Sequence, residues 1–176
     1  MGFVEETGAA QYYRDARILP IYEGTNGIQA IDLVTRKLPL EGGAVITSYI
    51  GDLREMAEEV RASNLPAFGK TADKLDAAID ALETASVWLG KTLASEPNKA
   101  LSGATPYLRL FGLAAGGCYL GRAAVKANRD GERAETQTAL ARFFAENLAV
   151  ACGGLAENVL HGADSVMALT PEALSV

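Results

Sequence analysis

The sequence predicts an all-α protein in which an up-down-up-down four-helix bundle follows a short helix-loop-helix segment. Apolar residues recur at intervals of three and four over long stretches, and no stretch shows the alternation that is typical of a strand. The connectors between these stretches are short, which forces consecutive helices to lie antiparallel beside each other. We therefore expect the helix-loop-helix segment in residues 1–38 and the bundle domain in residues 39–176.

The first segment is expected to contain two helices joined by an extended link. Residues 3–16 have a helical composition, and Pro20 interrupts the pattern because proline lacks an N–H group and restricts the residue before it. Thr25 or Asn26 is a suitable N-cap for the second helix, and Pro39 ends that helix. Its apolar positions are Ile28, Ile31, Val34 and Leu38.

Four long helices are expected between about residue 44 and residue 161. The second carries apolar residues from Phe68 to Leu93 at nearly heptad spacing. The third begins with Thr105 as its cap and Pro106 at its first helical position. The fourth is expected to bury one apolar stripe. That stripe comprises Leu140, Phe143, Phe144, Leu148, Ala151, Leu155 and Val159.

The third bundle helix is rich in glycine. Each glycine lowers the intrinsic helicity by up to about 1 kcal/mol relative to alanine. A neighbouring helix that approaches closely would explain them, because glycine has no side chain to hold that helix away. These residues are Gly112, Gly116, Gly117 and Gly121.

Composition and charge argue against several classes of protein. The net charge of −6 is unlike that of a nucleic-acid-binding protein, which needs a basic face. Cys118 and Cys152 belong to no CxxC pair and only one histidine, His161, is present, so no metal site is expected. We expect both thiols to be buried and reduced in a cytoplasmic protein, and His161 to cap a helix end or contact solvent.

No signal peptide or membrane-spanning helix is expected. The first residues, MGFVEETGAA, are acidic and contain no apolar core of the kind that signal peptides carry. The uncharged run Leu110 to Gly121 lies between two arginines and is shorter than the roughly 20 residues that a spanning helix needs. Membrane contact is therefore not expected.

One acid, Glu23, lies in the otherwise uncharged stretch PIYEGTNGIQ, and the residues admit two interpretations of it. An acid just before a helix complements the positive end of the helix dipole, which contributes a few tenths to about 1 kcal/mol. Alternatively, Glu23 is a general base, with Gly24 leaving room for a ligand and the N–H groups after Thr25 holding phosphate oxygens.

The first 38 residues resemble the C-terminal segment of acyl-CoA dehydrogenases. The resemblance is carried by MGFVEE, RDARI and, above all, IYEGTNGIQ. It implies that Glu23 is the catalytic base, which removes the pro-R α-proton of an acyl-CoA thioester while a hydride leaves the β-carbon for the flavin of FAD. The implied function is an FAD-dependent oxidoreductase of fatty acid metabolism.

The same resemblance assigns the neighbours of Glu23. Thr25, Asn26 and Gly27 align with the stretch that contacts the FAD phosphates, and Tyr22 and Gly24 flank the thioester. The family has a glutamine where this chain has Gly27, so any side-chain contact at that position is lost. The family further implies an acyl-CoA substrate, an electron acceptor such as an electron-transfer flavoprotein, and a homo-oligomer.

Residues 44–176 resemble the extra C-terminal bundle of longer bacterial acyl-CoA dehydrogenases, such as methylthiopropanoyl-CoA dehydrogenase-like enzymes. The chain would then hold only the end of the catalytic domain and should be inactive by itself. The alternative is a non-catalytic helical module for interaction or oligomerisation. Either way, surface that normally packs on further domains should be exposed. We expect this patch at Ile18, Leu19, Ile21 and Tyr22.

Overall fold

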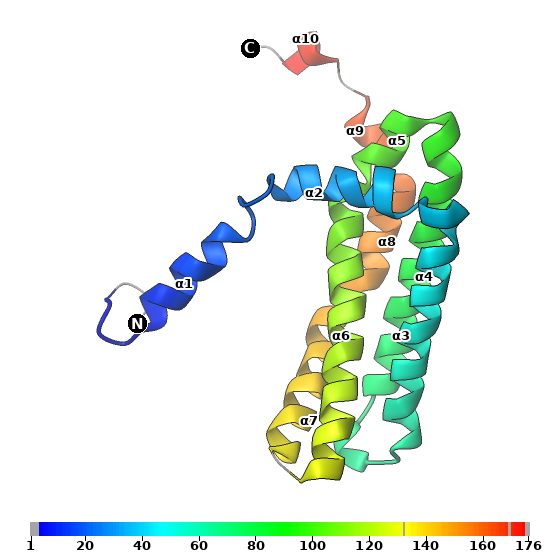
Figure 1. Ribbon diagram of the computed structural model, residues 1–176. Helices are drawn as coiled ribbons and strands as arrows, with labels where there is room; N and C mark the ends of the chain where they lie inside the picture. The colour runs from blue at the N-terminus through cyan, green and yellow to red at the C-terminus, as the bar shows by residue number, and fades with distance from the viewer. Residues whose placement is uncertain (1–3, 132, 169, 175–176) are drawn as a thin grey trace.

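The computed structural model describes residues 4–131, 133–168 and 170–174, and every regular element in those ranges is helical. The all-α class is thereby confirmed. Met1, Gly2 and Phe3, which begin the motif MGFVEE, lie outside the described residues. Figure 1 shows an elongated stack of helices with an arm, formed by α1 and α2, that projects from one end.

The arm and the long helices follow one another in chain order, with short π or 3-10 turns denoted η. The arm contains α1 (Ala9–Ile18), α2 (Asn26–Asp32) and the π turn η1 (Leu33–Lys37). The stack contains η2 (Leu40–Gly43), α3 (Ala44–Ala62), η3 (Pro66–Phe68), α4 (Thr71–Ser95), α5 (Pro97–Ser102) and α6 (Ala104–Asp130). It continues with α7 (Ala134–Phe143), η4 (Phe144–Leu148), η5 (Ala149–Ala151), α8 (Cys152–His161), α9 (Ala163–Val166) and α10 (Pro171–Leu174).

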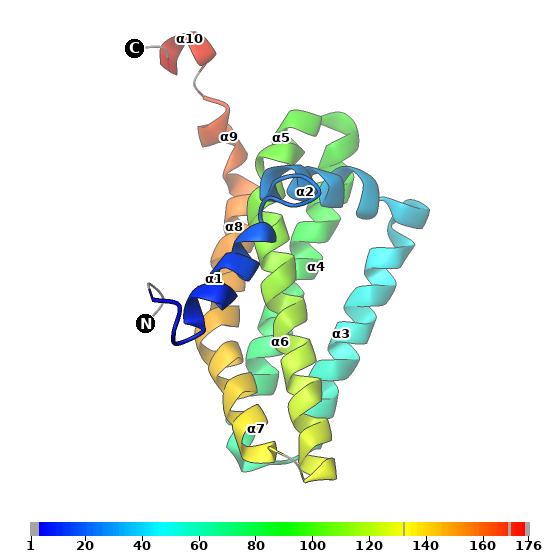
Figure 2. The ribbon, with the colours of Figure 1, turned by 60° about the vertical axis from the view of Figure 1, so that its left-hand side comes forward.

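Four helical rods make up the stack: α3, α4, α6 and the run from α7 to α8. Successive rods point in alternate directions along the long axis, and both ribbon views show them side by side (Figures 1 and 2). Their facing sides form one apolar core. The largest fully buried side chains are Tyr107, Leu53, Leu75, Ile79, Leu82, Leu89, Leu110, Val34, Val159, Thr71, Cys118 and Cys152.

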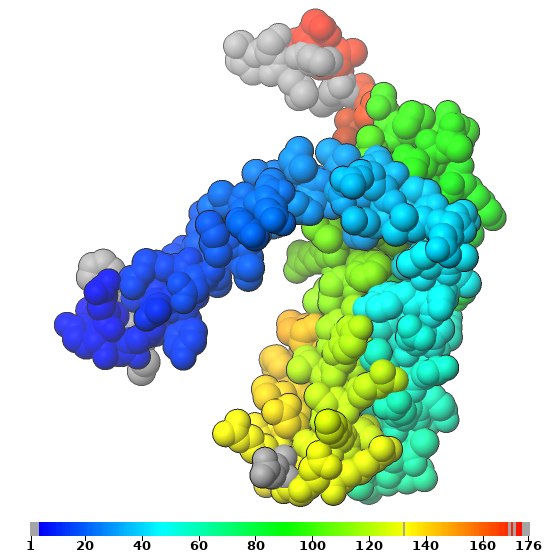
Figure 3. Space-filling model, in the orientation of Figure 1, coloured from blue at the N-terminus to red at the C-terminus, as the bar shows by residue number. Residues whose placement is uncertain are grey.

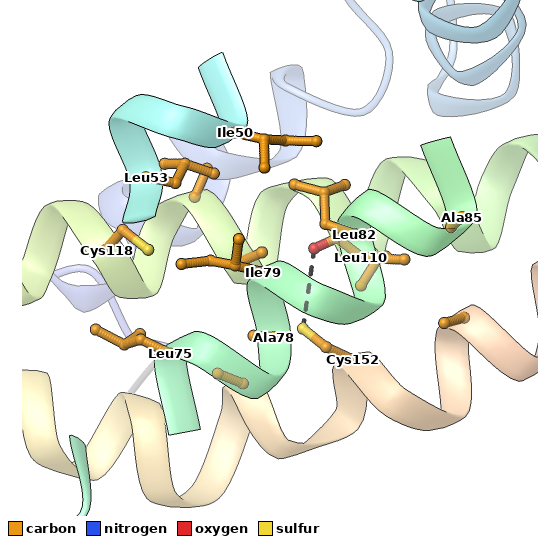
Figure 4. Packing of buried hydrophobic residues seen from close by; sticks show 14 of the residues in the cluster. Ile50, Leu53, Leu75, Ala78, Ile79, Leu82, Ala85, Leu110, Cys118 and Cys152 are labelled. Carbon is orange, nitrogen blue, oxygen red and sulfur yellow. Dashed lines mark hydrogen bonds between the residues drawn. The ribbon is translucent and has the colours of Figure 1, made fainter. Parts of the chain in front are cut away.

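Both cysteines lie in this core, as expected. Figure 4 shows Cys118 near Leu53 and Ile79, and the Cys152 thiol donating to the carbonyl oxygen of Leu110 at 3.9 Å. Burial raises the pKa of the Cys118 thiol to about 12 and that of Cys152 to about 11. Both thiols are therefore kept neutral and unreactive.

Two of the four glycines on α6 stand where another rod comes close. A Cβ atom at Gly117 would lie 2.7 Å from Leu75, and one at Gly121 would lie 2.9 Å from Val60. At Gly112 nothing lies within 4 Å of that position. The close approach is thus confirmed for Gly117 and Gly121, whereas Gly112 has no packing role of this kind.

The fourth rod buries only part of the expected stripe: Val159 is fully buried, and Phe144 and Leu155 pack partly buried against the core. Its buried residues are small, while Leu140, Phe143 and Leu148 are exposed. Alanine occupies the inner face because α7 and α8 lie flat against α6 and α4, leaving little room for larger side chains. The buried residues of this rod are Thr138, Ala141, Ala145, Ala149, Cys152, Ala156 and Val159.

The same rod bears on the expectation that no helix spans a membrane. By length and composition alone, the helical run Ala134–His161 is apolar enough to cross one. The expectation was based on uncharged runs, and Arg142, Glu146 and Glu157 interrupt the sequence of this rod. Within the described residues it lies lengthwise against α4 and α6, as a bundle helix does.

Three helix boundaries differ from the expectation. The first helix begins at Ala9 because Gly8, in a left-handed conformation, is its N-cap. The N-cap of α6 is Gly103 and not Thr105. Glycine fits position 103 because a Cβ there would lie 3.3 Å from Val159. The connector before α6 contains the short helix α5, which Pro97 opens at its first position.

Candidate functional site

The motif PIYEGTNGIQ covers most of the link between α1 and α2 and the first four residues of α2. At the end of α1 the Ile18 carbonyl accepts hydrogen bonds from the N–H groups of Ile21 and Tyr22, at 3.0 and 2.8 Å. The carbonyl of Pro20 then accepts from the N–H of Asn26 at 3.2 Å. These bonds close the link into a compact turn, whereas an extended link was expected.

Glu23 has a backbone conformation that is unusual for its residue type. Its φ is 53° and that of Gly24 is 98°, so two consecutive residues are left-handed. A non-glycine residue in this region is strained by about 1–3 kcal/mol and requires support from its surroundings. Gly24 cannot be replaced without strain, since a Cβ there would also lie 3.1 Å from Ile28.

Gln29 provides part of that support. Its side-chain amide donates a 2.6 Å hydrogen bond to the backbone carbonyl of Glu23, which ties the turn to the first turn of α2. Gln29 is part of the motif, although no role was predicted for it. The signal that could have revealed this role is the position of Gln29 in the first turn of the predicted helix, six residues after Glu23. A long amide side chain there can reach back to the turn that precedes the helix.

Thr25 is the N-cap of α2, as expected, with an extended backbone. Its hydroxyl makes no capping hydrogen bond, although an N-cap threonine normally does so. The first N–H groups of a helix have no partner within that helix and attract anions. Gly27 and Ile28 lie in this first turn. The space beside Gly27 is open, because the nearest heavy atom to a Cβ built there would be the Thr25 hydroxyl oxygen, at 3.8 Å.

The structure places every predicted site residue on this one turn, and it exposes them. Tyr22, Glu23, Thr25, Asn26 and Gly27 are exposed and Gly24 is half-buried. The apolar enclosure that the general-base interpretation requires around Glu23 is therefore not supplied by the described residues. The turn thus presents a carboxylate beside an open helix N-terminus, with no enclosing surface among the described residues.

The apolar patch expected beside Glu23 is exposed, and it is larger than expected. Ile28 and Ile31, two of the apolar positions named for this helix, are exposed together with Ile18, Leu19, Ile21 and Tyr22. The helix instead docks on α6 through Ala30, Val34 and Leu38. The arm surface, as we name the exposed patch, comprises Ile18, Leu19, Ile21, Tyr22, Ile28 and Ile31.

The arm is held at its second helix only. Figure 3 shows α1 standing clear of the lower half of the stack, with open space between them. Ala30 and Val34 are fully buried, so α2 is firmly seated, while on α1 only Ala10 is buried. The turn with Glu23 thus projects from the bundle and is attached to it through α2.

Other candidate residues do not assemble a site. His161 is exposed at the end of α8, 3.7 Å from Glu157, in agreement with the expected helix end. Across the described ranges, no three His, Cys, Asp or Glu side chains lie close enough together to hold a metal ion. Tyr107 is buried and hydrogen-bonded to Ser86 at 2.8 Å, which is a packing role within the core.

Comparison with family models divides the chain in two. Residues 49–170, more than half of the chain, match the model described as "Acetyl-CoA dehydrogenase C-terminal like". Residues 1–38 match "Acyl-CoA dehydrogenase, C-terminal domain". The chain belongs to the acyl-CoA dehydrogenase family. The turn with Glu23 thus lies in the part that matches the C-terminal domain of these dehydrogenases, while the boundary at residue 38 between the two units stays a prediction.

Three relatives among acyl-CoA dehydrogenases are similar to this chain. A 3-methylmercaptopropionyl-CoA dehydrogenase of Ruegeria pomeroyi is 36% identical over 95% of the chain and 29% of its own length. The broad-specificity linear acyl-CoA dehydrogenase FadE5 of Mycobacterium tuberculosis is 37% identical over 32% of the chain and 9% of its own length. A butyryl-CoA dehydrogenase of Syntrophomonas wolfei is 32% identical over 49% and 14%.

This chain therefore spans less than a third of the length of the relatives it matches. The match over 95% of the chain supports the expected correspondence with a C-terminal region of such an enzyme.

Proposed function

We propose that this chain is the C-terminal part of an acyl-CoA dehydrogenase that forms the α,β double bond of an acyl-CoA thioester, with Glu23 as the base for the α-proton. The observation that carries the proposal is the left-handed turn at Glu23 and Gly24, held by Gln29 in a chain of this family. A strained conformation at an acid is a feature that active sites retain.

The open N-terminal turn of α2 fits the family's cofactor, FAD. The Thr25 hydroxyl, unused as a cap, and the N–H groups of Gly27 and Ile28 would face its phosphate oxygens, while the Asn26 N–H already donates to the Pro20 carbonyl. When bound, FAD supplies the acceptor for the hydride that leaves the β-carbon. Glu23 holds the proton from the α-carbon, and Tyr22 and Gly24 flank the thioester and exclude water from it.

Several further properties follow from this proposal. The chain by itself should be inactive, because its site has one wall only and Glu23 is exposed. The complete enzyme is proposed to act in the cytoplasm as a homo-oligomer and to pass its electrons to an acceptor such as an electron-transfer flavoprotein. The residues that would set the acyl-chain length lie outside this chain.

The test replaces Glu23 by glutamine in an enzyme that joins this chain to the remaining dehydrogenase domains. Glu41 is a matched control, since it is also an exposed acid in a left-handed turn, with a φ of 49°. Removal of a general base lowers turnover by roughly 10²–10⁴-fold. We expect such a loss for Glu23→Gln with FAD still bound, and none for Glu41→Gln. Equal turnover in both variants would contradict the proposal.

A second candidate, a helical interaction module without activity, is favoured by the arm surface. Six apolar side chains are exposed around the turn, which is the composition of a docking site rather than of a free surface. Mixing the purified chain with FAD and an acyl-CoA tests the inactivity that both candidates predict for the isolated chain, and Glu23→Gln in the complete enzyme separates the two candidates. We expect a colourless protein without turnover, and a yellow protein that reduces an electron acceptor would refute the module.

A further inference from the structure

A small apolar cleft lies where the arm turns into the bundle. It has a volume of about 150 Å³, and residues of η1, η2, α3 and α6 line it. Leu40 and Val45 line the cleft and are 45% and 42% exposed, so the described chain leaves it open to solvent. Figure 1 shows this turn at the end of the stack from which the arm projects. The cleft is therefore accessible to a ligand.

Two local departures from the α-helix shape this cleft. At η1 the N–H of Leu38 donates to the carbonyl of Leu33 at 2.8 Å, a bond that spans five residues and widens the turn. Leu33, Lys37 and Leu38 thereby line the cleft together. Gly42 and Gly43, with φ values of 67° and 92°, then reverse the chain, so that residues on both sides of them reach the cleft. Turns of the π type occur frequently at functional sites.

Three aromatic rings form a rigid wall of the cleft. The ring of Tyr49 stacks on that of Phe111 with centroids 5.5 Å apart, and Tyr107 meets Phe111 edge-on at 6.2 Å. The tyrosine hydroxyls have partners of their own: Tyr49 contacts the Tyr119 hydroxyl at 3.4 Å, and Tyr107 contacts Ser86 at 2.8 Å. The rings therefore contribute carbon surface, and the wall is formed before any ligand binds. Such a wall suits an apolar group.

Among the described residues that line the cleft, only Lys37 is charged. Its neighbour Arg36 pairs with Asp32 at 2.8 Å, whereas no carboxylate in the described part of the chain forms an ion pair with Lys37. A lysine carries its ammonium on a long apolar stem, so it can cover apolar surface and still reach a charge. An anionic group at the mouth of the cleft would give Lys37 a partner.

The volume of the cleft sets the size of the apolar group. An apolar cavity of about 150 Å³ accommodates benzene, which has about the size of a six-carbon group. We propose that the cleft binds a small organic carboxylate, with an apolar group of about six carbons against Tyr49 and Phe111 and its carboxylate on Lys37. This site is independent of the dehydrogenase activity and of the turn with Glu23.

A larger cleft beside this one indicates no single ligand chemistry. It has a volume of about 840 Å³ and shares Leu38 and Ile46 with the smaller cleft. Its lining mixes apolar side chains with Lys91 and with Glu83, which already pairs with Arg54. Lys91 is exposed, so it provides a matched control: a lysine beside a different cleft of the same bundle.

The ligand is tested by titrating hexanoate into the full chain, with the methyl groups of leucine and isoleucine observed by NMR. We expect the signals of Leu33 and Ile46 to shift, with a dissociation constant on the order of 1 mM. Hexanol, which lacks the charge, and acetate, which lacks the apolar group, should each bind at least tenfold more weakly. Equal binding of hexanoate and hexanol, or hexanoate shifts confined to residues outside the cleft, would overturn the proposal.

The residues are tested with three variants whose folding is verified by circular dichroism. Lys37→Met keeps an apolar stem and removes the charge, so hexanoate binding should weaken at least tenfold while hexanol binding stays unchanged. Lys91→Met should alter hexanoate binding less than twofold. Val45→Phe, at the exposed edge of the cleft, fills it and should abolish the shifts from both ligands. Hexanoate binding that survives Lys37→Met, falls with Lys91→Met or persists in folded Val45→Phe would contradict this site.

Discussion

The arm and the bundle distribute their apolar side chains in opposite ways. In the bundle, leucines such as Leu53 and Leu82 have no exposed surface, and every rod contacts at least two others. In the arm, Leu19 is 73% exposed and the other apolar residues around Glu23 share its exposure. The bundle therefore carries its own hydrophobic stabilisation, at about 25 cal/mol per Å² of buried apolar surface, and the arm contributes little.

The difference shows that the region that stabilises the fold and the region that carries the proposed base are separate parts of the chain. The acid that we propose as the base stands in the least supported region, in a strained turn fixed by the hydrogen bond from Gln29 and the contacts of α2. The bundle anchors that turn through Ala30 and Val34 but does not enclose it. A site built on these residues requires a partner surface for its apolar wall, whereas the bundle requires none to fold.

The largest expected effect contrasts a leucine from each region. Leu82→Ala should lower the free energy of unfolding by about 2–5 kcal/mol, because it leaves a cavity among fully buried side chains. Leu19→Ala should change it by less than about 0.5 kcal/mol, since that side chain is exposed. Urea titration of both variants measures the contrast, and a comparable loss from Leu19→Ala would mean that the arm packs in solution.

Alkaline pH should destabilise the bundle through its buried thiols. The folded pKa values of about 12 for Cys118 and 11 for Cys152 lie above the unfolded value of about 8.5. The unfolded chain therefore loses these protons first, so the stabilisation present below pH 8.5 is lost as the pH rises toward 11–12. Between pH 8 and 10 we expect a loss of roughly 4 kcal/mol in urea titrations, with about half that slope in Cys118→Ala. An unchanged slope would contradict the burial of Cys118.

Glycine substitutions should give the smallest effects, and their signs should differ by region. Gly121→Ala brings a methyl group against the stiff side chain of Val60 and should cost about 1–2 kcal/mol. Gly112→Ala has free space and should gain up to about 1 kcal/mol of helix propensity. Gly24→Ala strains the arm turn and should leave the thermal midpoint of the bundle unchanged. A midpoint that falls with Gly24→Ala would show that arm and bundle unfold as one unit.

Much of the fold could be predicted because periodic apolar residues dictate helices. The long helices, the end of α2 before Pro39 and the buried cysteines all follow from local pattern and composition. The buried face of the fourth rod could not be predicted this way. There the helix buries its alanines so that it can lie close to α6, and periodicity alone does not distinguish that face from the one that carries Leu140 and Phe143.

The candidate site was predicted from a motif rather than from periodicity. The motif identified Glu23 and its neighbours, and the structure places them together on one turn. It gave no indication that Gln29 donates to the Glu23 carbonyl, because hydrogen bonds across a turn depend on φ values that side-chain pattern does not encode. The roles of these residues toward FAD and acyl-CoA remain predictions.

Native-state hydrogen exchange of the purified chain tests most directly the claim that the bundle folds by itself and presents an unsupported arm. Amides of α4 and α6 should exchange slowly, near the rate of global unfolding, while those of α1 and the turn at Glu23 should exchange within minutes. The first turns of α2 should be intermediate, since Ala30 is buried. Protection of α1 equal to that of α4 in a monodisperse sample would contradict the account.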